Sequence, residues 1–291
     1  MTREEVVAGA FQAIQRGSKS FRASSRLFNR ETRELSWLLY CWCRHCDDEC
    51  DGQVMGQGSA QRGSVVALRE KTGRVVRGEE VGELPFDALR QLLQERVIPP
   101  RLLHDHLQGF ELDEAGWTPR TQQDLIRYCY HVAGSVGCMM AIVMGVPADD
   151  AETLERASDL GIAFQLSNIA RDIREDHENG RCYIPQEWLD EFSIPREQLL
   201  DPRHQAGLLA IVGRIVDLVN SYEQNARKGV DRLPFRSRMA VLAAARIYGA
   251  IGRRVGALGA SAWDRRVTIS RTQKLGFLLP SFAEAVALRR N

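Results

Sequence analysis

Apolar residues recur every three or four positions along nearly all of the 291 residues, and no convincing stretch alternates apolar and polar residues as a β-strand would. This spacing is that of an amphipathic α-helix, so the sequence predicts an all-α protein. Turn-forming segments such as "DGQVMGQGS" (51–59) and "ENGRCYIP" (178–185) separate the helical stretches. We expect helices over about 3–16, 31–51, 60–77, 84–96, 100–114, 121–145, 149–177, 205–230, 235–258 and 272–289.

The chain contains no long polar linker and no repeat of solenoid length. We therefore expect one domain spanning residues 1–291, a length that a single hydrophobic core can still serve. The formal net charge is only +1, so no global field favours nucleic acid as a partner.

The expected compartment follows from the cysteines and the apolar segments. Seven cysteines in no repeated framework favour a reducing environment, and the first residues lack the apolar core of a signal peptide. The longest apolar stretch, 132–146, contains three glycines and a serine and is shorter than the roughly 20 residues that span a bilayer. We expect a cytoplasmic protein, for which peripheral contact with a membrane stays open.

Residues 40–51, "YCWCRHCDDECD", contain four cysteines and four acidic residues. On a helix that turns about 100° per residue, Cys43, Cys46 and Cys50 fall on one stripe. Thiols in a row along one helix cannot surround a zinc ion, and the sequence has no second Cys/His cluster to complete such a site. We therefore interpret these cysteines as small core residues.

The pattern Asp-x-x-x-Asp, which puts two carboxylates on one helix face, occurs twice in the chain. The stripe residues are Asp47 and Asp51 in the first occurrence and Gln165, Asn168, Asp172 and Asp176 in the second. Oxygen ligands favour Mg²⁺ or Mn²⁺, and Mg²⁺ also binds substrate phosphates. Facing stripes would therefore hold a phosphorylated ligand through metal ions; the alternative is two unrelated, exposed faces.

Basic and hydroxyl side chains near these stripes are suited to an anionic ligand. They are Ser18, Lys19 and Ser20 near a helix start in "GSKSFRASS" (17–25), together with Arg44, Arg171 and Arg181. Alternatively, the serines cap a helix and the arginines only pair with the acids. The helix expected at 121–145 also has small residues at Gly134, Gly137 and Ala141, which either leave room for a prenyl tail or allow close helix packing.

Several motifs resemble those of squalene and phytoene synthases, in the family's order and spacing. They are "SKSF", "YCWCRHCDDECD", "RYCYHVAGSVG" (127–137), "AFQLSNIARDIREDHENGRCYIP" (163–185) and "AWDRRVTISRTQKL" (262–275). The first acidic motif and "YCYHVAG" are most similar to those of bacterial phytoene synthases. The resemblance implies the all-α isoprenoid synthase fold, with both acidic helices lining a central cavity.

The resemblance also implies roles for individual residues. The implied Mg²⁺ ligands are Asp47, Asp51, Asn168, Asp172 and Asp176. The implied diphosphate contacts are Ser18, Lys19, Ser20, Arg44, Gln165, Arg171 and Arg181, with Arg265 and Lys274 from the C-terminal motif. Tyr40, Tyr130, Tyr183 and Tyr248 match tyrosines of the reaction chamber. Where some squalene synthases carry a further acid, this chain has Cys50, although Asp48 lies nearby.

The reaction implied is the Mg²⁺-dependent, head-to-head condensation of two geranylgeranyl diphosphates to 15-cis-phytoene in carotenoid biosynthesis. It passes through a cyclopropylcarbinyl (prephytoene) diphosphate, releases diphosphate and needs no NADPH. The alternatives are squalene, dehydrosqualene or hydroxysqualene formation from farnesyl diphosphate, or a non-catalytic subunit that binds a prenyl diphosphate. A hydrocarbon product also implies contact with a membrane surface or with downstream carotenoid enzymes.

Overall fold

The computed structural model describes residues 1–17, 21, 24–51 and 63–288, except for the side chain of Asp51. Three of the predicted diphosphate contacts, Ser18, Lys19 and Ser20, therefore lie outside the described residues, as does the predicted ligand group of Asp51. The described part of the chain forms helices and turns with no strand, which confirms the all-α prediction.

The helices follow one another along the chain and most agree with the predicted ranges to within a few residues. They are α1 (Arg3–Gly17), α3 (Arg30–Asp51), α4 (Val65–Val76), α5 (Leu84–Glu95), α6 (Pro100–Glu114), α7 (Gln122–Cys129), α8 (Ser135–Val143), α9 (Ala151–Glu178), α10 (Gln186–Glu191), α11 (Gln205–Arg227), α12 (Phe235–Leu258), α13 (Arg271–Gly276) and α14 (Leu278–Ala287).

Three features differ from the predicted helices. The helix predicted over 272–289 is divided at Phe277 into α13 and α14. A π-helical turn, Tyr130–Gly134, lies between α7 and α8 where the sequence predicts one uninterrupted helix. The six-residue α10 was not predicted, because a helix of this length is too short to show a clear apolar period.

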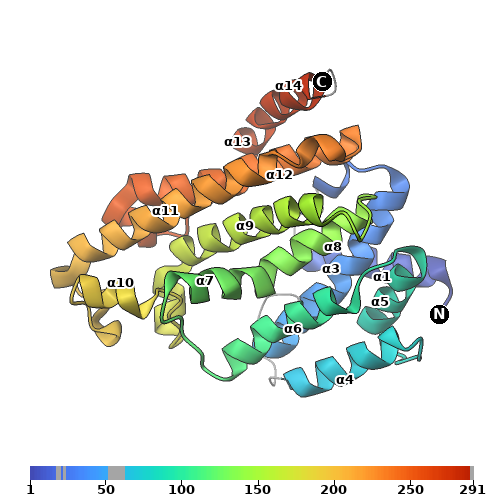
Figure 1. Ribbon diagram of the computed structural model, residues 1–291, viewed down its shortest axis with the longest axis horizontal. Coiled ribbons are helices and arrows are strands. Elements are labelled where there is room, and N and C mark those ends of the chain that lie inside the picture. Colours follow the sequence, from blue (N-terminus) through green and yellow to red (C-terminus); the bar gives the residue numbers. More distant parts are fainter. Residues whose placement is uncertain (18–20, 22–23, 52–62, 289–291) are drawn as a thin grey trace.

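Helix α9 is the centre of the molecule. Figure 1 shows α9 running between α12 on one side and α7 and α8 on the other, and α9 also packs against α11. Asp150 caps its N-terminus by accepting a hydrogen bond from the Thr153 backbone N–H at 3.1 Å. The helix ends at a turn in which Gly180 has a φ of 74°, a backbone conformation that glycine adopts without strain.

Two large apolar clusters form most of the core, and a third, small cluster contains Val230, Leu242 and Ala285. The first contains buried side chains of α3, α5 and α6, such as Trp42, Phe86 and Leu103. The second contains buried side chains of α9 and α11, such as Leu166 and Ile211. Helix α8 packs against both α3 and α9, so the two acidic helices flank the same element.

Glycines allow the π-turn and α8 to approach α9 backbone to backbone. A Cβ on Gly137 would lie 2.3 Å from the Ala157 carbonyl oxygen, and one on Gly161 would lie 2.2 Å from the Ala133 carbonyl oxygen. Gly134 likewise faces the Ser158 hydroxyl. Of the two explanations for these small residues, close helix packing therefore holds at Gly134 and Gly137.

The run from Gln122 to Val143 is long and apolar enough to cross a membrane, and it is the one such helix among the described residues. It exceeds the length expected from 132–146 because the helical run begins at Gln122. Half of the apolar window is buried inside the molecule, where its glycines contact α9, so in this fold it serves as a core helix.

Candidate active site

The second acidic stripe lies on α9 as a partly exposed strip on an otherwise buried helix. Asn168, Asp172 and Asp176 are half-buried, whereas Ile169 and Ile173 beside them are buried in the apolar core. A central helix with such a strip presents polar groups to a space that solvent or a ligand can enter. Gln165 shares this half-buried strip, as the helical spacing predicts.

Asp172 is held by two arginines. Arg171 donates from Nε to Asp172 Oδ1 at 2.8 Å, and Arg266 donates from Nη2 to Asp172 Oδ2 at 3.2 Å. Arg266 also pairs with Glu175 at 2.9 Å. The sequence did not predict Arg266; the only signal was a second basic residue beside Arg265 in "WDRRV".

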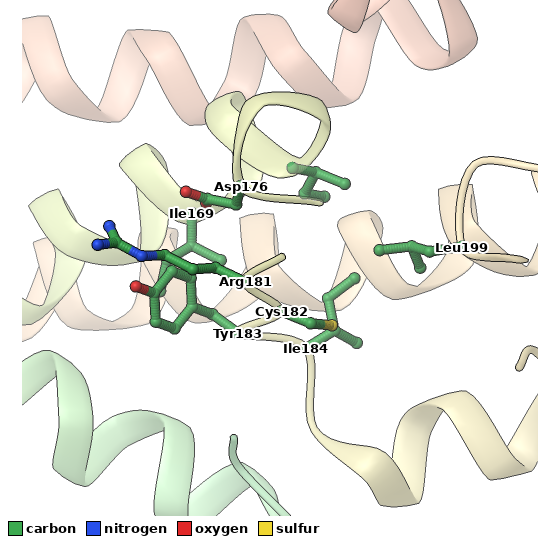
Figure 2. A pocket seen from close by; sticks show the side chains of 8 residues that line it. Ile169, Asp176, Arg181, Cys182, Tyr183, Ile184 and Leu199 are labelled. Atoms are coloured by element: carbon green, nitrogen blue, oxygen red, sulfur yellow. The ribbon is translucent and has the colours of Figure 1, made fainter. Parts of the chain in front are cut away.

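Asp176 is a carboxyl group that its surroundings do not favour as an anion. Burial and the nearby charge of Asp172 raise its pKa to about 7, while the cation of Arg181 opposes the rise. Figure 2 shows Asp176 and Arg181 at the edge of a pocket of about 10 Å³, which Tyr183 also lines. The backbone N–H of Arg181 donates to the Asp176 carbonyl at 2.8 Å, so the loop folds back at the end of α9.

These groups fit a hard divalent cation. Two half-buried carboxylates and an amide oxygen on one strip are oxygen donors, and a bound cation would stabilise Asp176 as an anion. Within the described ranges, no three acidic, histidine or cysteine side chains are already gathered around one point. Such an open donor set is compatible with Mg²⁺, which keeps several waters and binds phosphate oxygens.

The first acidic stripe lies on α3 and is similarly half-buried at Tyr40, Arg44 and Asp47. Arg44 pairs with Asp47 at 2.9 Å and donates from Nε to the buried Asp48 at 2.9 Å. The arginine therefore belongs to the carboxylate stripe, as predicted. Cys41 and Cys46 of this helix are buried, which supports the interpretation of its cysteines as core residues.

The Tyr40 hydroxyl is buried and has no hydrogen-bond partner among the described residues. Burial raises the Tyr40 pKa to about 12, so this hydroxyl keeps its proton at neutral pH. Its ring stacks on Phe21 with 5.4 Å between ring centroids. A buried, unpartnered donor of this kind is costly unless a ligand accepts from it.

The other predicted tyrosines have aromatic or acidic partners that the sequence did not reveal. Tyr183 and Tyr128 stack on each other, and both hydroxyls donate to Asp113 at 2.8 Å. Tyr130 donates to Asp105 at 2.6 Å. Both acids lie on α6, and in each case burial comes first among the causes that raise the tyrosine pKa.

Tyr248 stacks on Phe164 of α9 with ring centroids 4.0 Å apart. Burial raises the Tyr248 pKa, and the nearby charge of Arg171 lowers it in part. Phe164 was not singled out from the sequence, although it directly precedes Gln165 in the second motif.

Two further predicted residues, Arg265 and Lys274, belong to the C-terminal motif. Arg265 is exposed and, with Arg254 and Arg266, lines a surface pocket of about 360 Å³. Lys274 is half-buried on α13. Their contacts with a ligand stay predictions.

Comparison of the whole fold with solved structures defines the class of protein. A solved dehydrosqualene synthase in complex with a ligand matches 98% of both chains with a TM-score of 0.86 at 24% sequence identity. At this identity the likeness shows the fold, which is the isoprenoid synthase fold.

The sequence comparisons then give the family. The model of the squalene/phytoene synthase family matches residues 14–273, and the chain belongs to that family. It is 43% identical over 281 residues to the 15-cis-phytoene synthase of Enterobacter agglomerans, covering 94% of each chain. It is 39% identical to the 15-cis-phytoene synthase of Pantoea ananas, covering 99% of this chain and 95% of the other.

Proposed function

We propose that this chain is a 15-cis-phytoene synthase that joins two molecules of geranylgeranyl diphosphate head to head. The observation that carries the proposal is the identity of 43% and 39% to two 15-cis-phytoene synthases over nearly the whole chain. The oxygen-rich strip on α9, with arginines on its acids, supports a diphosphate substrate bound with divalent cations.

The carboxylates and arginines act on the leaving diphosphate. Asn168, Asp172 and Asp176 on α9, with Asp47 and Asp51 on α3, would hold Mg²⁺, for which Mn²⁺ can substitute. When bound, the metal neutralises the diphosphate and favours ionisation of the allylic C–O bond. The guanidinium groups of Arg44, Arg171 and Arg266 add fixed positive charge for the diphosphate oxygens.

The aromatic residues protect the cation that ionisation leaves on the substrate. That cation is attacked by the double bond of the second substrate, and loss of a first proton, for which the released diphosphate is an acceptor, closes the ring of a cyclopropylcarbinyl diphosphate. A second ionisation and rearrangement then join the two first carbons. The stacked Phe164 and Tyr248 offer π-faces that stabilise a carbocation and contain no strong nucleophile. The Tyr40 hydroxyl, buried and without a partner in the described part of the chain, is a donor for a diphosphate oxygen.

The final step is loss of a proton to form the central double bond, so the reaction needs no NADPH. Cytoplasmic substrates and a hydrocarbon product further imply a protein that works at a membrane surface and passes phytoene to the next carotenoid enzyme.

A product assay tests the proposal. Purified protein is incubated with Mg²⁺ and either geranylgeranyl or farnesyl diphosphate, each with and without NADPH, and hexane extracts are analysed by chromatography and mass spectrometry. We expect a C40 hydrocarbon with a central conjugated triene from geranylgeranyl diphosphate without reductant. A C30 product from farnesyl diphosphate alone, or no hydrocarbon from either substrate, would contradict the proposal.

A further inference from the structure

The C-terminal helix α14 buries residues that a surface helix normally exposes. Ser281 and Ala285 of α14 are completely buried. Glu284 points the same way, since it accepts hydrogen bonds from Arg227 of α11 at 2.7 Å and from Arg246 of α12. The inner side of α14 therefore consists largely of small and ion-paired residues, followed by Leu288, which packs against the buried cluster of Val230, Leu242 and Ala285.

Large apolar side chains occupy the opposite face. Leu275, Leu279 and Phe282 have exposed fractions of 65%, 77% and 50%. Leu275 belongs to α13, whereas Leu279 and Phe282 are three residues apart on one side of α14, the next helix. The Phe282 ring also packs edge-on against Phe235 of α12, with 5.8 Å between ring centroids. Figure 1 shows α13 and α14 on the outside of α12, at the edge of the molecule and close to the C-terminus.

This arrangement reverses the amphipathic pattern of a surface helix, in which the apolar stripe faces the core. Single exposed apolar residues are common in soluble proteins, but several on two consecutive helices mark an interaction surface. Two other exposed valines, Val66 and Val97, are in α4 and the α5–α6 connection and form no such group with each other.

The charge of the segment indicates which partner covers this group. Residues 265–288 contain four basic residues, Arg265, Arg266, Arg271 and Lys274, and one acid, Glu284. Glu284 is paired inward with Arg227 and Arg246, and Arg266 is paired with Asp172 and Glu175 of α9. Arg265 and Arg271 are exposed. The segment thus combines an exposed apolar group with net positive charge, which is the composition of helices that lie on anionic bilayers.

A second copy of the chain fits this face less well. In a symmetric dimer the same patch meets itself, so the basic residues of one copy would oppose those of the other. Anionic lipid headgroups instead complement these charges while the acyl boundary accepts the leucines and the phenylalanine.

We propose that α13 and α14 dock the protein on an anionic lipid surface, with Leu275, Leu279 and Phe282 inserted at the headgroup boundary. This proposal rests on the proposed function in one respect: a hydrocarbon product must pass from the enzyme into lipid. Binding to lipid does not require turnover and can be measured without substrate.

Vesicle co-sedimentation tests the docking face. The full chain is sedimented with vesicles of phosphatidylcholine alone and with vesicles containing phosphatidylglycerol. We expect binding to the anionic vesicles, and a roughly tenfold loss for the double variant Leu275→Ser/Leu279→Ser, because two apolar side chains no longer insert. The matched control, Val66→Ser/Val97→Ser, removes two equally exposed apolar residues elsewhere and should bind as the unmodified chain does.

A second experiment tests the contribution of positive charge, using Arg271, which is exposed on α13. Arg271→Gln should weaken binding to anionic vesicles about fivefold, and raised salt should weaken binding of the unmodified chain.

Equal binding by the leucine and valine double variants would overturn the proposal. The proposal would also be overturned if the unmodified chain bound no vesicles and Leu275→Ser/Leu279→Ser changed its oligomeric state in ultracentrifugation. A protein that forms phytoene but does not bind anionic vesicles would refute the docking proposal alone.

Discussion

Arg266 joins the C-terminal segment to the acidic face of α9, with 3.2 Å between its Nη2 and Oδ2 of Asp172. The indole N–H of Trp263 donates to the Ala170 carbonyl at 3.0 Å, which fixes the same segment two residues before Asp172 on α9. A residue 94 positions along the chain is thereby brought to the second acidic motif.

The first prediction concerns the charge of Arg266. Arg266→Gln removes a cation beside Asp172, and a hydrogen bond to a charged group contributes about 1.5–3 kcal/mol. We therefore expect kcat/KM for geranylgeranyl diphosphate to fall roughly tenfold or more. Stability should change by less than about 1 kcal/mol, since the Arg266 side chain is 54% exposed. Arg174→Gln, at an exposed position of α9, is the control; an equal loss in that variant would argue against a specific role.

The second prediction concerns the pH dependence that Asp176 introduces. Its folded-state pKa of about 7 exceeds that of an unfolded carboxyl, about 4, so the folded protein binds this proton more tightly. The stabilisation is complete below about pH 4 and is lost as the pH rises toward 7. Asp176→Asn should therefore stabilise the metal-free protein by about 1–3 kcal/mol at pH 8, and by less at pH 5.5.

Urea unfolding at the two pH values measures this difference. Mg²⁺ should reduce the advantage of Asp176→Asn at pH 8, because the cation stabilises the ionised carboxylate. The exposed Asp149→Asn serves as the control. A pH-independent difference between Asp176→Asn and the unmodified protein would be inconsistent with the raised pKa.

The third prediction concerns the contact between α8 and α9. Gly137→Ala forces a methyl group to within 2.3 Å of the Ala157 carbonyl oxygen, so the helices must separate. Overpacking of this kind costs about 1–3 kcal/mol in the free energy of unfolding. Gly213→Ala on α11 has no neighbour within 4 Å and should instead stabilise the protein by up to about 1 kcal/mol. Chemical denaturation of both variants compares them, and the same sign of change in both would refute the close-packing explanation.

The fourth prediction concerns Asp113, which accepts from both Tyr128 and Tyr183 at 2.8 Å. Asparagine offers only one acceptor oxygen, so Asp113→Asn leaves one buried tyrosine hydroxyl without its acceptor. We expect a loss of about 1–3 kcal/mol in unfolding free energy, measured by denaturation. Asp217→Asn at an exposed position of α11 should have almost no effect. A loss no larger in Asp113→Asn than in this control would show that the two hydrogen bonds contribute little.

Helical periodicity predicted the all-α fold. It also predicted which residues lie on each acidic stripe, because residues at a fixed spacing share one face of a helix. Asn168, Asp172 and Asp176 lie together on α9 for this local reason. Periodicity could not predict Arg266, which reaches Asp172 only through the tertiary fold.

The same limit applies to other parts of the molecule. Asp105 and Asp113 become partners of tyrosines only when α6 packs near the π-turn and the loop after α9, and neither acid has a distinctive local pattern. The roles of Gly134 and Gly137 also stayed open in the sequence, because the carbonyl and hydroxyl groups they accommodate belong to α9.

The central claim is that two acidic helices hold a metal-bound prenyl diphosphate for head-to-head condensation, and its most direct test is the initial rate of phytoene formation in Asp47→Asn and Asp172→Asn. Circular dichroism would first establish that both variants are folded. With geranylgeranyl diphosphate and Mg²⁺, each rate should fall about 100-fold or more, equivalent to about 2.7 kcal/mol in activation free energy, while Asp149→Asn keeps the full rate. Undiminished phytoene formation by either folded variant would contradict the account.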